Sequence, residues 1–563
     1  MEQPTAEAAG EAGTAPAAPT RPRRKLAWWA WVTAYVAAGV TLFFCYRWLS
    51  ETQAVTSDGA ANALQAWAML HGDPLLRGWT VGDVSFYTTE LPEYMGVELI
   101  RGLGPDVVHV AAAFTYTLLV LLAGVLAKGR ARGREALVRV LIASGIMIAP
   151  QLHLGASIVL LGADHTGTEV PLLATWLVLD RAPRRWYVPL IITVMLAWVQ
   201  ISDSIALLVA IAPLVVVCVL RIFYGLVRRK PLTSLWYEAA LAVAAVASVY
   251  AAQLAVHVIH HLGGYVSIGL PTLPAILSTV PAHLRLTADG VLVLYGADFS
   301  GLHPGVAAAF AAVHVVGLAL AVWAFGLAIW RFFRIDDLVV QVLTVAIIIN
   351  LAAFAFSRLP GAVYTFRQIV AVLPLGAVLA GRLLSGPVTR LRLVPALSVI
   401  LACYVAALGY GAAQPAVPAQ DQALADWLVA HHLTTGLTGW NANTLTLDTG
   451  GRVQLLPTFF GWSGAAPDVY QSKASFYDQR LNYADFAVST PAGAPDPLSY
   501  RIAVADFGRP ARVYYFGDRT IMIWDKNLLA DSARHAPSKG RRGAADAEQG
   551  LDREAARAAC RAR

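Results

Sequence analysis

Apolar stretches recur along the chain from Leu26 to about residue 410, separated by short polar segments. A helix needs about 20 apolar residues to cross a bilayer, and most of these stretches approach that length. We predict about eleven spans, at residues 26–49, 107–127, 136–161, 168–180, 186–200, 204–220, 236–258, 305–330, 338–356, 367–383 and 393–410. The pattern indicates a mainly α-helical bundle that crosses a membrane many times.

Basic residues predict the orientation of this bundle. Lysine and arginine gather in alternate connections between the spans, and such an excess marks cytoplasmic segments. These segments are 1–25, 128–134, 181–185, 221–230, 331–334 and 382–392. We expect the tail 1–25 to be disordered and cytoplasmic. Because the number of spans is odd, the chain after residue 410 is predicted to lie outside the plasma membrane.

Three predicted outer segments are long enough to form structure. Residues 50–106 are acidic, residues 259–304 are rich in glycine, proline and leucine, and residues 411–530 follow the last span. The last segment has a helical pattern at 421–432, strand-like runs at 444–448, 453–460 and 501–506, and a hairpin signal around Gly517-Asp518 within 513–524. We expect a small extracytoplasmic α+β domain there, followed by a disordered tail at 531–563.

Composition excludes several other classes of protein. Apolar residues make up 57% of the chain and charged residues only 14%, whereas soluble domains carry about 25% charged residues. The net charge of +7 comes from clusters between spans, without the basic face and interleaved aromatic residues of a nucleic-acid-binding protein. The four cysteines form no close pair, which excludes a disulfide framework and a cysteine-based zinc site.

Acidic residues at the predicted outer membrane face are the first candidates for chemistry. Asp58 follows the first span, and Asp164 lies in the next short outer connection. Charged groups at a membrane boundary are costly unless they are paired, hydrated or metal-bound. A structural alternative is open for both acids. Ser57 or Asp58 can cap a helix over 60–70, and Asp164 can cap the span at 168–180.

Two further groups of polar residues lie in outer loops. Tyr87, Glu90 and Glu93 combine an aromatic ring with acids that can hold a polar acceptor, although solvated carboxylates on an amphipathic helix are equally expected. Arg358 and Arg367 run against the positive-inside bias. A lipid phosphate is the natural partner of such a guanidinium, and snorkelling towards headgroups is the alternative.

The order of these features resembles the C-type superfamily of polyprenyl-phosphate-sugar glycosyltransferases, which includes protein mannosyltransferases, aminoarabinose transferases and oligosaccharyltransferases. The likeness rests on a first helix, an outer loop with the early Asp58, and the runs NALQAWAMLHGDPLLRGW (62–79) and FYTTELPEY (86–94). It covers about residues 26–410. The Ala-, Arg- and Gly-rich composition resembles that of actinobacterial membrane proteins. One departure is Gly59, which stands where the family has a second acid next to the first.

The resemblance implies a role for each candidate residue. Asp58 would be the catalytic base and Asp164 the second catalytic acid, while Arg358 or Arg367 would meet the phosphate of a polyprenyl-phosphate sugar. Asp164 and His165 would hold a divalent metal. The acceptor would be a cell-envelope glycan, a lipid or a protein. No nucleotide is expected, since the sequence lacks a G-x-x-x-x-G-K-[ST] phosphate loop.

Two other functions are open at this stage. A secondary transporter would explain the many spans and the polar residues Asp203, Gln200 and His153 in or near them. A non-catalytic protein of the same fold, which binds a lipid or acts as a scaffold, would share every architectural feature. Halves related by a repeat would favour the transporter. A cavity that joins the outer acids to an arginine would favour the enzyme.

Overall fold

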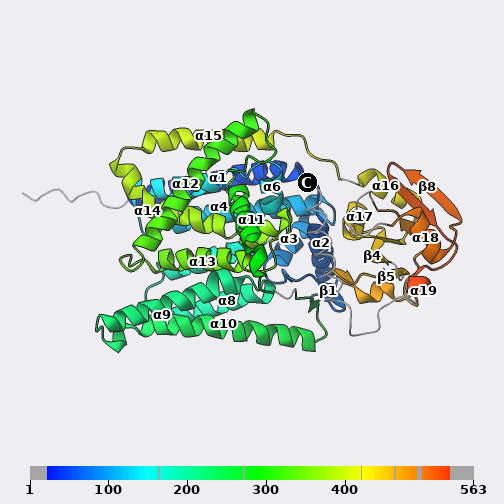
Figure 1. The fold of residues 1–563 in the computed structure, drawn as a ribbon, viewed down its shortest axis with the longest axis horizontal. Helices are drawn as coiled ribbons and strands as arrows, with labels where there is room; N and C mark the ends of the chain where they lie inside the picture. Colours follow the sequence, from blue (N-terminus) through cyan, green and yellow to red (C-terminus); the bar gives the residue numbers. More distant parts are fainter. Residues whose placement is uncertain are drawn as a thin grey trace, which may run out of the picture.

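The computed structural model describes residues 22–162, 165–269, 273–419, 421–461, 464–490 and 498–532. The tails predicted as disordered, 1–25 and 531–563, fall outside these ranges except for residues 22–25 and 531–532. Most of the described chain is helical. Figure 1 shows the long helices lying side by side along the longest axis of the molecule, with a smaller domain containing a sheet at one end.

Eight helices of the described chain are long and apolar enough to cross a membrane. Their spans are Trp29–Glu51 in α1 (Pro22–Glu51), α4 (Asp106–Lys128), Leu207–Val227 in η1 (Leu207–Ile211) and α9 (Ala212–Val227), α10 (Trp236–His261), α12 (Val306–Trp330), α13 (Leu338–Ala355), α14 (Val372–Arg390) and α15 (Val394–Ala412). Each lies at a predicted span. The predicted helical membrane bundle is therefore confirmed.

The other three predicted spans are occupied by shorter helices. The stretch 136–161 is divided between α5 (Gly133–Met147) and α6 (Leu154–Leu160). Pro150 lies between them, and His153 has a left-handed backbone with φ of 64°, so one continuous helix cannot form there. The remaining two are α7 (Thr166–Arg181) and α8 (Tyr187–Ser202), with 16 residues each.

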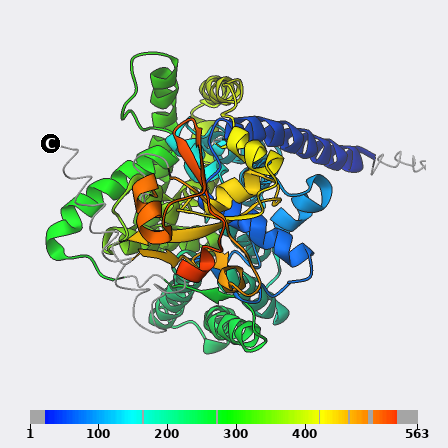
Figure 2. The same ribbon diagram turned by 90° about the vertical axis from the view of Figure 1, so that its right-hand side faces the viewer.

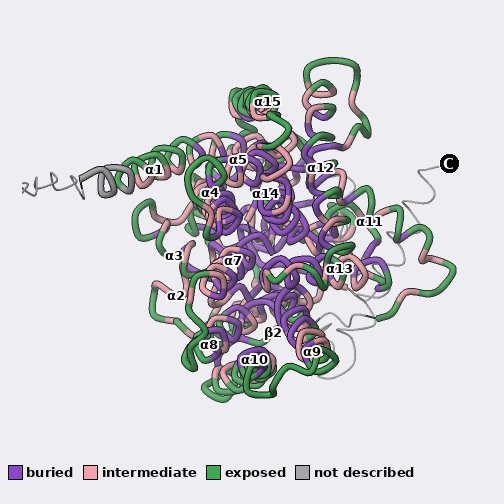
Figure 3. The backbone as a smooth tube through the Cα atoms, turned by 90° about the vertical axis from the view of Figure 1, so that its left-hand side faces the viewer, coloured by how far each residue is buried: buried purple, intermediate pink, exposed green. Residues whose placement is uncertain are grey.

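The bundle has a buried centre and an apolar periphery. In Figure 3 the buried residues lie in the middle of the bundle, while α15 and α10 are largely exposed at its edges. Within the spans, 72% of residues are buried in α4 and α14, against 28% in α10 and 17% in α15. A helix that is apolar but poorly covered by protein is suited to contact with lipid.

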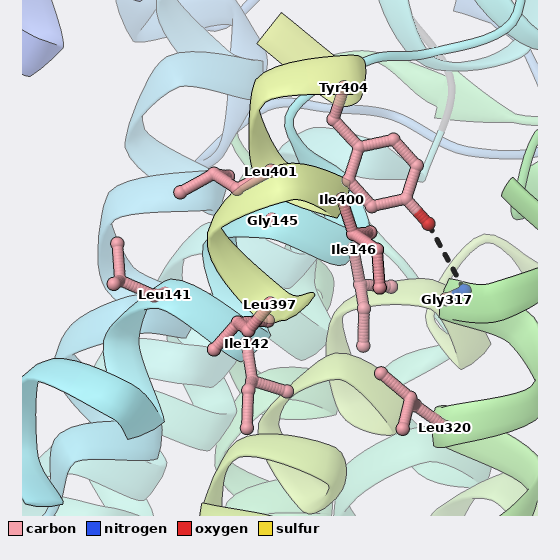
Figure 4. Close-up of a pocket in the computed structure, with 10 residues that line it drawn as sticks. All are labelled: Leu141, Ile142, Gly145, Ile146, Gly317, Leu320, Leu397, Ile400, Leu401 and Tyr404. Atoms are coloured by element: carbon pink, nitrogen blue, oxygen red, sulfur yellow. Dashed lines mark hydrogen bonds between the residues drawn. The ribbon is translucent and has the colours of Figure 1, made fainter. Parts of the chain in front are cut away.

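Helix α15 packs against α1, α5 and α12 and makes a hydrogen-bonded contact with α12 through a tyrosine. The Tyr404 hydroxyl accepts a hydrogen bond from the Gly317 N–H of α12 at 3.1 Å and donates to the Val313 carbonyl at 3.2 Å. A Cβ at Gly317 would lie 2.6 Å from that hydroxyl, so the contact requires glycine. Figure 4 shows Tyr404 above a small apolar cavity of about 260 Å³ between α5, α12 and α15.

A three-stranded sheet joins the first two predicted outer loops to the terminal domain. The first loop contains α2 (Ser57–Leu70), β1 (Trp79–Val81) and α3 (Glu90–Arg101), and the second contains β2 (Val266–Ser267) and α11 (Val280–Leu294). Strand β1 pairs in parallel with β2 and antiparallel with β6 (Ser472–Lys473) of the terminal domain. This sheet fixes the terminal domain against the first loop.

The terminal domain combines helices with a six-stranded mixed sheet. Its elements are α16 (Gln422–Ala430), β3 (Thr435–Thr438), α17 (Ala442–Asp448), β4 (Gln454–Gly461), β5 (Gly464–Pro467), β6, η5 (Ala474–Tyr477), β7 (Phe486–Val488), α18 (Tyr500–Phe507), β8 (Arg512–Phe516), β9 (Arg519–Ile523) and α19 (Leu529–Ser532). The strand order is β5-β4-β3-β7-β9-β8. The α+β class, the first helix and the last hairpin are confirmed. Figure 2 shows this domain covering the end of the bundle.

Two strand predictions in this domain are wrong. Residues 444–448 form helix α17, which lies between the sheet and α2. Leu445 packs into the core of the domain and Leu447 into the core of the first loop, so both sides are buried and the apolar alternation does not indicate a strand. Residues 501–506 belong to α18, whose N-terminus is capped by Ser499. Its buried residues Ala503 and Phe507 have helical spacing.

Candidate active site

Asp58 lies in the first turn of α2 with its carboxylate directed at two distant segments. Oδ2 accepts a hydrogen bond from Nη1 of Arg367 at 2.9 Å, and Oδ1 accepts one from Nε2 of Gln471 at 2.8 Å. Arg367 belongs to η4 (Val363–Ile369), while Gln471 directly precedes β6 in the terminal domain. The carboxylate therefore joins the start of α2 to two other segments, whose contacting residues are 309 and 413 positions away in the sequence.

Asp58 is not needed to cap its helix. The N-cap of α2 is Thr56, whose side chain accepts from the Gly59 N–H at 3.1 Å. The alternative that Ser57 or Asp58 provides the cap is therefore wrong, because the helix begins one residue earlier than that alternative requires. The carboxylate of Asp58 remains available for other contacts.

A cavity that is open towards solvent adjoins this carboxylate. Helix α2 and strand β1 lie next to the terminal domain there (Figure 1). Both acidic and basic groups face the cavity. Its lining residues are Asp58, Gly82, Asp83, Val84, Phe86, His165, Arg367, Gln368, Tyr470 and Gln471. The structure therefore brings together Asp58, Arg367 and His165 of the predicted residues. It adds Asp83, Tyr470 and Gln471, for which the sequence shows no motif.

His165 is oriented by a buried carboxylate. Its Nδ1 lies 2.6 Å from Oδ2 of Asp203, which also accepts from Thr168 at 2.6 Å, while Oδ1 accepts from the Ile205 N–H at 3.0 Å. Burial by itself disfavours the imidazolium, but the Asp203 carboxylate outweighs burial and raises the pKa of His165. The cavity thus has two cationic groups, Arg367 and a readily protonated His165.

The described side chains do not fit a divalent metal. Asp164, predicted as a ligand, lies outside the described residues. Both oxygens of Asp58, which lines the cavity together with the other predicted ligand, His165, are engaged, one of them by the Arg367 guanidinium, which repels a metal cation. No three His, Cys, Asp or Glu side chains are grouped as metal ligands within the described ranges. No step below passes through a metal.

Gly59 explains the departure from the paired acids of the resembled family. The residue is buried, and a Cβ there would lie 3.0 Å from both the Leu161 carbonyl oxygen and a methyl group of Val108. A carboxylate side chain has no space at this position. The first predicted outer loop therefore presents the Asp58 carboxylate without a second acid next to it in the sequence.

The predicted acceptor-binding residues lie away from the cavity lining. The Tyr87 hydroxyl donates to the Pro74 carbonyl at 2.8 Å. In α3, Glu90 is buried and Glu93 is half-buried with its Oε1 atom enclosed, and Glu93 accepts a hydrogen bond from Thr115 of α4 at 2.5 Å. The expectation of solvated carboxylates does not hold for these two. Their role in acceptor binding stays a prediction that this geometry does not support.

The two predicted arginines also differ in position. Arg367 lines the cavity, whereas the exposed Arg358 does not line it. The Arg358 backbone N–H donates to the Leu273 carbonyl of the second outer loop at 3.0 Å. Of the two candidates for a phosphate contact, the structure therefore favours Arg367. Of the outer acids that such a cavity is expected to join, Asp164 lies outside the described residues, and the next residue, His165, lines the cavity.

Glu93 makes the stability of the protein depend on pH. Burial raises the pKa of its carboxyl to about 8, against about 4.3 in an unfolded chain. Below the unfolded pKa, Glu93 is protonated in both states and the free energy of unfolding is undiminished. It falls as the pH rises towards the folded pKa, because the unfolded chain loses this proton first. Glu93→Gln is therefore expected to show a smaller fall in Tm than the wild type between pH 5 and pH 8.5 in detergent. Exposed Glu135→Gln is the control and should follow the wild type. Equal falls in all three proteins would contradict the prediction.

Comparisons with known proteins find similarity in structure alone. No family model matches the sequence, and no curated protein matches it. Among solved structures, the chain is similar to the archaeal oligosaccharyltransferase AglB from Archaeoglobus fulgidus in complex with an inhibitory peptide and a dolichol-phosphate, with a TM-score of 0.45 and 13% identity, covering 81% of this chain and 69% of the other. A complex of the same enzyme with Zn and sulfate has a TM-score of 0.45 and 13% identity, with coverage of 81% and 67%. A form tethered to an acceptor peptide has a TM-score of 0.44 and 13% identity, with coverage of 81% and 69%.

Proposed function

We propose that this membrane protein is a glycosyltransferase that moves a sugar from a polyprenyl-phosphate donor to an extracytoplasmic acceptor. The observation that carries the proposal is the meeting of Asp58 and Arg367 at 2.9 Å in one polar cavity. A base and a fixed cation side by side are what transfer from a phosphate ester needs. The resemblance of the first outer loop to polyprenyl-phosphate-sugar transferases supports the same reaction.

Asp58 acts as the general base in this proposal. One carboxylate oxygen of Asp58 accepts the proton of an acceptor hydroxyl. At the same time the hydroxyl oxygen of the acceptor bonds to the anomeric carbon of the donor sugar. The bond between the anomeric carbon and the phosphate oxygen breaks through an oxocarbenium-like state, and its electron pair leaves with the lipid phosphate. The products are the glycosylated acceptor, polyprenyl phosphate and a protonated Asp58, whose proton then passes to water.

Arg367 and His165 meet the charge of the departing phosphate. A guanidinium makes paired hydrogen bonds to phosphate oxygens, and fixed cations in a partly dry cavity stabilise charge that develops during the reaction. Asp203 holds His165 by Nδ1, so that the ring is oriented and favours its protonated form. The Arg367 contact with Asp58 keeps the base and the phosphate site adjacent before the donor binds.

The position of the cavity supports an enzyme over a transporter. Its lining comes from the first predicted outer loop, the short connection after α6, the segment around η4 between α13 and α14, and the terminal domain. Transporter sites lie near the bilayer midplane at broken helices. The similar archaeal structures were solved with a dolichol-phosphate and with an acceptor peptide, and a lipid phosphate is the donor class proposed for this chain.

Sugar transfer is tested with the purified protein in proteoliposomes that contain polyprenyl-phosphate-linked, radiolabelled sugars. A glycosyltransferase moves label from the lipid to an added envelope glycan or protein and releases polyprenyl phosphate. A transporter or scaffold leaves all the label on the lipid, and that result with every donor tried would contradict the proposal.

Phosphate binding distinguishes the two predicted arginines. Polyprenyl phosphate at about 100 times its Kd should stabilise the folded wild-type protein by about 2.7 kcal/mol, which thermal unfolding in detergent can measure. Arg367→Gln should lose most of this stabilisation and Arg358→Gln should keep it, because only Arg367 lines the cavity. Uncharged polyprenol controls for binding of the chain alone. Loss in Arg358→Gln but not in Arg367→Gln would place the phosphate elsewhere.

A further inference from the structure

A pair of aromatic rings from the terminal domain lies beside the cavity, and one of the two rings lines it. The rings of Trp440 and Tyr470 are stacked with centroids 5.9 Å apart and an angle of 23° between them. Tyr470 lines the cavity. Its hydroxyl lies close to Gly82, since a Cβ added to this glycine would be 3.1 Å from the hydroxyl oxygen. Trp440 remains 42% exposed despite its size. An apolar platform therefore adjoins the polar groups around Asp58.

The chain around Trp440 is fixed relative to Asp58. The Ser57 hydroxyl, one residue before Asp58, donates to the Trp440 carbonyl at 2.9 Å. Trp440 follows β3, which lies between its parallel neighbours β4 and β7. The chain passes from β3 to β4 on one side and later to β7 on the other, so Trp440 stands at the carboxyl end of a strand where the connection reverses. Such reversal points are common ligand sites in sheets with parallel strands.

We propose that Trp440 and Tyr470 form a subsite for a sugar ring, so that the acceptor of the proposed transferase is a carbohydrate. This inference rests on the function proposed above. A sugar ring has a face of C–H groups that packs on an aromatic ring and a rim of hydroxyls that needs polar partners. Trp440 offers the exposed indole, while Asp58 and Asp83 offer carboxylates in the adjoining cavity.

Gln471 marks where the reacting hydroxyl binds. Its amide nitrogen donates to Oδ1 of Asp58 at 2.8 Å. An acceptor hydroxyl donates to a carboxylate in the same way and replaces this amide when the sugar binds. Gln471 has a left-handed backbone with φ of 52°, a conformation that is unfavourable for a residue with a side chain.

The local backbone argues against an extended peptide at the same place. Strand β1 leads directly into Gly82 and Asp83 of the cavity, but it is paired on one side with β2 and on the other with β6. A peptide that binds by adding a strand needs a free strand edge. Strand β1 has no free edge, whereas the Trp440 indole is 42% exposed.

The experiment compares Trp440→Ala and Trp440→Phe with the wild type, using Tyr500→Ala as a control for loss of an exposed aromatic residue in the same domain. Acceptors are defined gluco-, manno-, galacto- and arabino-oligosaccharides and peptides of similar length. Trp440→Ala should raise the KM for the oligosaccharide that serves as acceptor at least tenfold. Trp440→Phe should stay within about threefold, and Tyr500→Ala should be unchanged. Saturation-transfer NMR with the same oligosaccharide should show binding that Trp440→Ala abolishes.

Donor chemistry separates failure of this inference from failure of the proposed function. Slow release of polyprenyl phosphate to water, measured without acceptor, reports donor cleavage in the wild type and should stay within about twofold of that rate in Tyr500→Ala. If the wild type releases polyprenyl phosphate but transfers sugar to peptides and binds no oligosaccharide, the carbohydrate subsite is wrong and the transferase stands. An unchanged oligosaccharide KM in Trp440→Ala overturns the subsite as well. Absence of both release and transfer in the wild type overturns the proposed function.

Discussion

Asp58→Asn is expected to reduce sugar transfer by about 10²- to 10⁴-fold, the usual contribution of a general base. Asparagine keeps the size of the side chain but cannot accept the proton of an acceptor hydroxyl. Its amide also ends the charge contact with Arg367, which lies 2.9 Å away in the wild type. Initial rates of transfer from a radiolabelled polyprenyl-phosphate sugar in proteoliposomes measure the effect.

A matched control for this prediction is Glu51→Gln. Glu51 ends α1 seven positions before Asp58 in the sequence and pairs with Arg47 at 3.1 Å, outside the cavity lining. Its rate should stay within about twofold of wild type, since exposed ion pairs contribute little. A wild-type rate in Asp58→Asn would remove Asp58 as the base, and an equal loss in both variants would point to a general structural effect.

Arg382→Met is expected to lower the free energy of unfolding by about 3–5 kcal/mol, the cost of removing one partner of a buried ion pair. Arg382 is buried in α14 and joins three other helices. Its guanidinium lies 2.9 Å from Asp180 of α7 and 2.6 Å from Asp337 at the start of α13, and it donates to the Leu126 carbonyl of α4 at 2.7 Å and 3.0 Å. Methionine fills similar space but leaves these acceptors without their cation.

Arg390→Met provides the comparison within the same helix. Arg390 is exposed in the last turn of α14, so its loss should change stability by less than about 0.5 kcal/mol. Thermal unfolding and the monodisperse fraction in size-exclusion chromatography, both in the same detergent, measure the difference. Equal stability of the two variants would show that the Arg382 network contributes no more than an exposed arginine.

Arg382 also shows how a topology signal can conceal a structural role. Arg382 is the first basic residue of the connection 382–392. Its charge is part of the basic excess that predicts a cytoplasmic loop there. The structure places it inside α14, buried against the ends of three other helices. Nothing adjacent in the chain indicates this, because its partners are 45 to 256 residues away.

The terminal domain was predictable where local rules apply and unpredictable where a segment is buried on two sides. The Gly517-Asp518 turn identified the β8–β9 hairpin, since turn chemistry depends on adjacent residues. Residues 444–448 alternate between polar and apolar like a strand, yet α17 places Leu445 and Leu447 into two different cores. Alternating apolar residues show only that those side chains are buried. In a short helix enclosed on two sides, such residues can be buried on opposite sides of the helix.

The candidate site was only partly visible before folding. Asp58 and Arg367 stood out because charged residues at the predicted outer membrane face require partners. Their contact with each other, and with Gln471, could not be predicted, since nothing near any of the three residues encodes a partner more than 300 positions away. Asp203 was read as a polar residue near a span, and its hold on His165 emerges only when α7 and α8 pack together.

Hydropathy and charge along the chain were thus sufficient to establish a multi-pass helical protein followed by a small α+β domain. Both are local quantities that add up over about 20 neighbouring residues and need no knowledge of contacts. The chemistry of the cavity depends instead on three loops and a separate domain meeting at one point. That meeting is fixed by helix packing and by the β2-β1-β6 sheet, which exist only in the folded chain.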